Sequence, residues 1–119
     1  MKNLDLECAK LGRRLAESGI DEKVFTQALG VLEEQGPYAC FLYLQAREGK
    51  AGQEIVKQAT NFLVLHLGAG VNTQRPLEFV HHLASDLDRL LFARDLLRQA
   101  FVYASYHAKT KLEKTVEES

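Results

Sequence analysis

The sequence predicts an all-α protein, a compact bundle of about five to six helices with a long, broadly apolar C-terminal helix. Apolar residues recur at helical spacing along nearly the whole chain, and no run of β-branched residues alternates with polar ones between turns. With 46% apolar and 26% charged residues in a chain of 119, the composition is that of an ordinary globular protein with one core. We therefore expect a single helical domain over residues 1–119.

Three helices are predicted in the N-terminal part of the chain. An apolar stripe predicts the first from Leu4 to Ser18, with charged residues on the opposite side. Asp21 is placed to cap the second helix, and Gly36-Pro37 has the order expected where a helix stops. Because the first turn of a helix tolerates the missing N–H of proline, Pro37 can also begin a third helix, which covers residues 38–47.

A fourth, strongly apolar helix is predicted from Ile55 to Leu67, between two glycine-containing segments. Glycines at both ends of residues 49–52 predict a loop before this helix, and Gly68-Ala69-Gly70 predicts its end. The longest loop-like stretch follows at residues 71–76. A short fifth helix is then expected over residues 77–82.

The last helix is predicted to begin at Ser85 or Asp86 and to run to about Val116. Apolar positions between Leu90 and Ala104 cover more than half of its circumference. A helix of this kind lies at the centre of a bundle or in a subunit interface. The charged residues 109–119 are expected to form a frayed tail.

Charge and cysteine content limit the classes of function. The 15 Lys and Arg residues against 16 Asp and Glu residues give no overall field that attracts nucleic acid or anionic membrane, so anion binding must come from local patches. Cys8 and Cys40 lack zinc-site spacing and have apolar neighbours, so we expect reduced core cysteines. No signal peptide or membrane span is recognisable, and we expect a cytoplasmic protein without membrane contact.

Catalytic and metal-binding patterns are missing from the sequence. It contains no nucleophile elbow, phosphate-binding loop or zinc-protease motif. His81 and His82 are adjacent, so on a helix they point about 100° apart and cannot bind one metal ion from one face. His66 is expected to be half-buried and His107 to lie on the surface. We therefore expect no enzyme activity, no catalytic residue, no cofactor and no metal.

The alternative to that expectation is a ribonuclease. Residues 75–81, which begin with Arg75 and end with His81, resemble the R-x(4–6)-H element of helical HEPN ribonucleases. That resemblance implies RNA cleavage without metal, by His and Arg from two protomers. Pro76 stands where the element usually has a polar residue.

Basic residues gather on two predicted helix faces and are the candidate RNA-binding residues. Guanidinium and ammonium groups at helical spacing can contact a phosphate backbone without reading its sequence. The alternative is a solvated face, because acidic residues lie one turn from most of them. Aromatic residues 38, 43, 92, 103 and 106 are interpreted as core or interface residues, not as stacking platforms for bases. The candidates are Lys10, Arg13 and Arg14 on the first helix and Arg94, Arg98 and Lys109 on the last.

Three segments in order carry a resemblance to a known family: the first helix with Ala9-Lys10, residues 29–44 around Gly36, and residues 86–100 of the last helix. Together they are similar to the small helical subunit of type III-B (RAMP module) CRISPR effector complexes. Gln35-Gly36-Pro37 stands where that family usually has Asn-Gly-Leu. Leu96-Leu97-Arg98 stands where it has Trp-Leu-Lys.

The resemblance implies a non-catalytic subunit in antiviral defence that packs along the guide-bearing backbone of the complex. It implies other effector subunits, copies of itself and guide or target RNA as partners. Arg98 and Lys10 match basic positions of the family, and the other basic residues are inferred from the helix faces. The alternative from a different class is a helical adaptor or homodimer without a nucleic-acid role, which associates through the face of Phe92, Leu96 and Tyr103.

Overall fold

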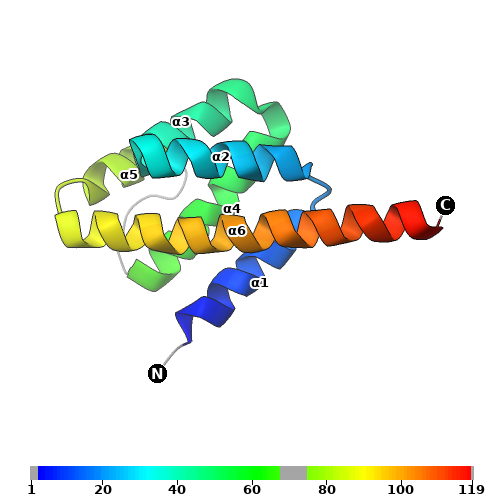
Figure 1. The fold of residues 1–119 in the computed structure, drawn as a ribbon. Coiled ribbons are helices and arrows are strands. Elements are labelled where there is room, and N and C mark those ends of the chain that lie inside the picture. The colour runs from blue at the N-terminus through cyan, green and yellow to red at the C-terminus, as the bar shows by residue number, and fades with distance from the viewer. Residues whose placement is uncertain (1–2, 68–74, 119) are drawn as a thin grey trace.

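The computed structural model describes residues 3–67 and 75–118, with side chains as far as Lys111. These residues form a compact all-α bundle without a strand, as the sequence predicts (Figure 1). The helices are α1 (Leu4–Glu17), α2 (Glu22–Gln35), α3 (Pro37–Arg47), α4 (Gly49–Leu67), α5 (Pro76–Leu83) and α6 (Leu87–Glu118).

Helix α6 is the longest element, and the bundle is organised around it. Its 32 residues span about 48 Å at 1.5 Å per residue, which matches the longest dimension of the molecule, 49 Å. Helices α1 and α2 pack against it, while α3 and α4 pack against each other. In Figure 1 the C-terminal turns of α6 extend beyond every other helix. The other helices therefore leave this end of α6 uncovered.

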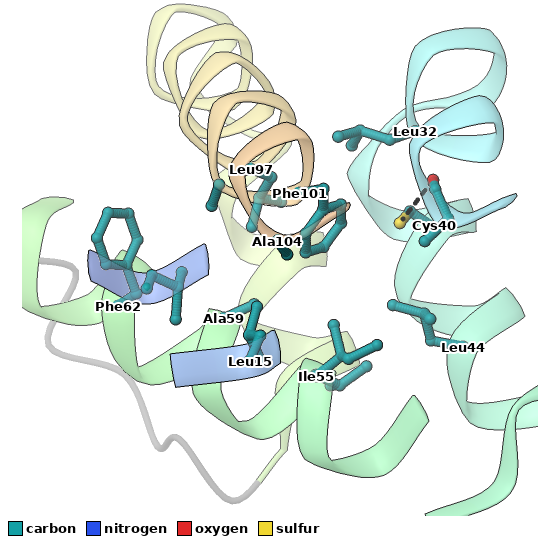
Figure 2. Packing of buried hydrophobic residues seen from close by; sticks show 14 of the residues in the cluster. Leu15, Leu32, Cys40, Leu44, Ile55, Ala59, Phe62, Leu97, Phe101 and Ala104 are labelled. Atoms are coloured by element: carbon teal, nitrogen blue, oxygen red, sulfur yellow. Dashed lines mark hydrogen bonds between the residues drawn. The ribbon is translucent and has the colours of Figure 1, made fainter. Parts of the chain in front are cut away.

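The core contains side chains from all six helices. Four phenylalanines are fully buried, one each from α2, α3, α5 and α6: Phe25, Phe41, Phe79 and Phe101. Figure 2 shows Leu15 of α1 and Ile55 of α4 in the same cluster as Leu97 and Ala104 of α6. Burial of this apolar surface is the main force that holds the helices together.

The predicted helix boundaries are confirmed where the sequence contains capping residues. The Asn3 side chain accepts a hydrogen bond from the Leu6 N–H at 3.2 Å, and Asp21 accepts one from the Lys23 N–H at 2.9 Å. Gly36 has φ 96°, a conformation that favours glycine, and Pro37 is the first residue of α3. The sharp turn between α2 and α3 follows from these two residues.

The prediction of a loop over residues 49–52 is wrong. These residues form the first turn of α4, which Glu48 alone separates from α3. A Cβ at Gly52 would overlap the Leu44 carbonyl oxygen of α3. The glycine is needed because the two helices approach closely at this point, so it indicates packing rather than a loop.

The C-terminal helices agree with the sequence within a few residues. α5 covers Pro76–Leu83, and the Asp86 side chain accepts a hydrogen bond from the Arg89 N–H at 3.2 Å at the start of α6. The backbone of α6 is helical to Glu118, through most of the segment expected to fray. Fraying in solution stays a prediction. The helix end predicted at residues 68–70 lies outside the described residues, as do residues 71–74 of the loop predicted at 71–76.

Candidate nucleic-acid interface

The six candidate basic residues lie on the protein surface but not in one site. Arg94 is half-buried and the other five are exposed. Arg14 lines a hollow between α1 and α4, whereas Arg94 and Arg98 line a different hollow between α2 and α6. The candidates therefore belong to two separate surfaces.

On α1, two of the three candidates form ion pairs along their own helix. Lys10 Nζ lies 3.6 Å from Glu7 Oε1, and Arg13 Nε lies 3.0 Å from Glu17 Oε1. Such exposed pairs contribute little to stability, and they are what a solvated face would contain. Arg14 has no carboxylate partner among the side chains that the structure describes. Of the three candidates on α1, Arg14 is therefore the one that can bind an anion without first breaking an ion pair.

On α6, Arg94 and Arg98 lie one turn apart and share a hollow of about 280 Å³ with Glu33 of α2 and Asp95. Arg98 Nη2 lies 4.0 Å from Asp95 Oδ1, a long ion pair, and Arg94 has no such partner within the described part of the chain. Arg98 also lines a second hollow of about 240 Å³ on the α1 side. Arg98 therefore stands on a ridge where it can reach an anion on either side. The carboxylates of Glu33 and Asp95 reduce the local positive potential.

Further along α6, Lys109 extends the row of cations. It lies eleven residues beyond Arg98, about 16 Å along the helix axis. Tyr106, between them in sequence, is 64% exposed. We define the α6 edge as Arg94, Arg98, Tyr106 and Lys109. An exposed aromatic ring among cations is a common feature of surfaces that bind single-stranded nucleic acid.

The aromatic residues are more exposed than the sequence predicts. Tyr38, Phe92 and Tyr106 all lie on the surface, so they are not core residues, and their interpretation as interface residues stays a prediction. Tyr43 and Tyr103 are half-buried. The Tyr103 hydroxyl donates to the Asp5 carboxylate of α1 at 3.0 Å, and this hydrogen bond raises the pKa of Tyr103.

Helix α1 covers most of the face that the homodimer alternative requires. Leu96 is only 6% exposed, and its carbonyl oxygen accepts a hydrogen bond from the Cys8 thiol at 3.5 Å. Leu96 and Tyr103, two of the three residues of that face, therefore make contacts with α1 of the same molecule. The expectation that this face is free for a partner is wrong. Over residues 87–111 of α6, the exposed large apolar residues are instead Leu87 and Leu91, one turn apart, and Phe92.

Both cysteines are small core residues, as predicted. Cys8 and Cys40 are buried and free, and the Cys40 thiol donates to the Ala28 carbonyl oxygen at 3.4 Å, the dashed line in Figure 2. Burial raises the pKa of Cys8 to about 11, where Asp5 and Glu7 also contribute, and the pKa of Cys40 to about 12. Neutral thiols of this kind are poor nucleophiles at neutral pH.

The histidines are distributed over three helices. His107 is exposed and His66 half-buried, both as expected, and the His66 ring centroid lies 4.4 Å from that of Phe62. Arg75 forms an ion pair with Glu78 at 3.1 Å, while the exposed His81 lies near Tyr38 with ring centroids 6.4 Å apart. Over residues 3–67 and 75–118, no group of three or more His, Cys, Asp or Glu residues could hold a metal ion.

Comparison with family models, curated proteins and solved structures gives no match to this chain. Within its described residues, no helix combines the length and the apolarity needed to cross a membrane.

Proposed function

We propose that this chain is a non-catalytic small subunit of a CRISPR ribonucleoprotein effector complex, which contacts RNA through the α6 edge in antiviral defence. The observation that carries the proposal is the edge itself. Arg94 lacks a described carboxylate partner, Arg98 stands on a ridge between two hollows, and the exposed side chains of Tyr106 and Lys109 follow further along the same helix.

The chemistry of the edge suits a phosphate backbone. Each guanidinium can donate two hydrogen bonds to a phosphate, and contacts of this kind do not depend on the base. Tyr106 offers a flat ring on which a base can stack. Because the net charge of the chain is −1, the interaction depends on this local row and is expected to be weak for the isolated protein.

Assembly with other subunits forms the second part of the proposal. Leu87 and Leu91 expose apolar side chains at the N-terminal end of α6, and packing against copies of this chain or other effector subunits would bury them. The resemblance of residues 29–44 and 86–100 to CRISPR small subunits supports this kind of complex.

A helical adaptor or homodimer without RNA is the second candidate. The same exposed Leu87 and Leu91 favour it, and the ion pairs of Lys10 and Arg13 fit a surface that is only solvated. The two candidates differ in whether the α6 edge binds RNA, which can be measured directly.

The test is binding of fluorescein-labelled single-stranded RNA, followed by anisotropy over a range of NaCl concentrations. Arg94→Glu with Arg98→Glu should weaken binding. If each arginine contacts one phosphate, the slope of log affinity against log salt should become shallower by about 1.4, since each contact on a single strand contributes about 0.7.

Lys50→Glu with Lys57→Glu is the matched control, because it makes the same charge change on exposed residues of α4. This variant should keep the wild-type slope. Equal losses in the two variants would mean that only net charge matters and would refute a defined site on α6. Membership of the complex is tested by purification of the tagged chain from native cells, where guide RNA and effector subunits should accompany it. An oligomer without RNA would favour the adaptor.

A further inference from the structure

The hollow between α1 and α4, which Arg14 lines, contains no residue of the α6 edge. Its volume is about 370 Å³, within the range of about 300–1,000 Å³ that is usual for small-molecule sites. We define the α1–α4 groove by its lining residues: Glu7 and Arg14 of α1 and Gln58, Asn61, Phe62, Leu65 and His66 of α4. Glu7 and Arg14 are two turns apart, so opposite charges line one wall about 10 Å apart along the helix.

The Glu7 carboxylate on the α1 wall of the groove is a hydrogen-bond acceptor, and Lys10 Nζ lies 3.6 Å from its Oε1 atom. Gln58 Nε2 donates to Glu54 Oε1 at 2.7 Å. Because a carboxylate only accepts, this bond fixes the orientation of the amide. Gln58 Oε1 is left buried, without a hydrogen-bond partner among the described residues. Because a carboxylate only accepts hydrogen bonds, Glu7 favours a ligand that brings N–H donors to the groove.

The opposite end and the inner surface have different chemistry. Arg14 offers guanidinium donors without a described carboxylate partner. The rings of Phe62 and His66 form an aromatic pair, with Phe62 almost completely buried and Leu65 exposed at the rim. Asn61 adds an exposed amide that can both donate and accept. The groove therefore combines acceptors, an apolar surface and one cation.

We propose that the α1–α4 groove binds one nucleotide whose base carries an exocyclic amino group, with guanine as the best fit. The N1–H and amino group of guanine donate to the Glu7 carboxylate, the base lies against Leu65 and the edge of Phe62, and the phosphate pairs with Arg14. Uracil has no amino group and satisfies Glu7 less well. The inference relies on the proposed function only for RNA as the natural source of that nucleotide.

The experiment is titration of the isotope-labelled protein with each of the four nucleoside 5′-monophosphates, followed by NMR of the backbone amides. Shifts should concentrate on α1 and α4. GMP should bind about tenfold more tightly than UMP, the difference expected for one good bidentate contact to a base. Arg14→Gln should weaken GMP binding, and Glu7→Gln should remove the preference for GMP over UMP. Arg13→Gln is the control, because Arg13 is paired with Glu17 and does not line the groove.

Several results would overturn the proposal. Equal affinity for GMP and UMP would exclude base recognition, and the same shifts with inorganic phosphate alone would reduce the site to an anion contact. Tighter binding of a free amino acid such as glutamate would assign the two charges to a zwitterion instead. Oligouridine with a single guanosine separates RNA from free nucleotide: tighter binding than plain oligouridine, lost in Glu7→Gln, supports RNA as the source. The Arg94→Glu, Arg98→Glu variant should still bind GMP, so this groove and the α6 edge can fail independently.

Discussion

Replacement of Gly12 by alanine should destabilise the protein, because α1 crosses α6 at this glycine. A Cβ at this position would lie 2.7 Å from the backbone nitrogen of Ala104, 2.7 Å from Tyr103 Cβ and 2.8 Å from the carbonyl oxygen of Ala100. Ordinary contacts of a Cβ begin at 3.4 Å, so α1 would have to move away by several tenths of an ångström. Two of the three neighbouring atoms are backbone and cannot yield by changing a rotamer.

Gly30 provides the matched control. It lies inside α2, and a Cβ there would meet nothing within 4 Å. Alanine should stabilise α2 at this position by about 0.5–1 kcal/mol, the usual gain over glycine in a helix interior. The same gain applies at Gly12, so the difference between the two variants isolates the packing cost. Overpacking of a core costs about 1–3 kcal/mol.

Thermal and urea unfolding followed by circular dichroism at the helix band would measure this difference. At about 4 °C per kcal/mol for a chain of this size, the two variants should differ in Tm by roughly 4–12 °C, with Gly12→Ala the lower. Equal stability of Gly12→Ala and Gly30→Ala would refute the close crossing of α1 and α6.

Two further predictions concern the same core. Tyr103→Phe removes the hydroxyl that donates to Asp5 and should lower Tm by less than Gly12→Ala does. Tyr106→Phe should leave Tm unchanged, because that side chain is exposed. Equal losses of Tm in Tyr103→Phe and Tyr106→Phe would contradict the contact with Asp5. At about pH 8, both thiols should react with a disulfide reagent in urea but not in the native protein. Because folding raises the pKa of Cys8 to about 11 and of Cys40 to about 12 from 9.0, the stability contributed by the neutral thiols is complete below pH 9. This stability should be lost as the pH rises from 9 through the folded-state pKa values of the two thiols. A Cys40→Ala variant should lose less stability than the wild type over the same pH range.

Local signals in the sequence were enough to predict most of the fold. Helix boundaries depend on contacts within a few residues, such as the hydrogen bond of Asp21 with Lys23 or the Gly36-Pro37 turn. The residue types that make such contacts can be recognised in the sequence alone. The loop prediction for residues 49–52 failed for the opposite reason. Gly52 is required by the Leu44 carbonyl oxygen of a different helix, and no pattern within α4 indicates that neighbour.

The candidate sites were predictable only in part. Ion pairs such as Lys10 with Glu7 follow from spacing along one helix and were foreseen. The surroundings of Arg14 and Arg94 depend on α4 and α2, which are distant in sequence. For the same reason the sequence did not reveal that α1 covers Leu96, or that Gln58 and Glu7 line one groove.

The packing of α1 also determines which residues of α6 remain available for binding. Gly12 lets α1 approach the Ala100–Ala104 side of α6 closely, and Asp5 then holds Tyr103 and Gln99 on that flank. With α2 on the other flank, Arg98 projects from the strip of α6 between the two helices. Loosening the crossing at Gly12 would therefore change the shape of both hollows beside Arg98. A variant that weakens this packing should impair RNA binding without altering any charge, whereas a solvated face with no binding role would show no such dependence.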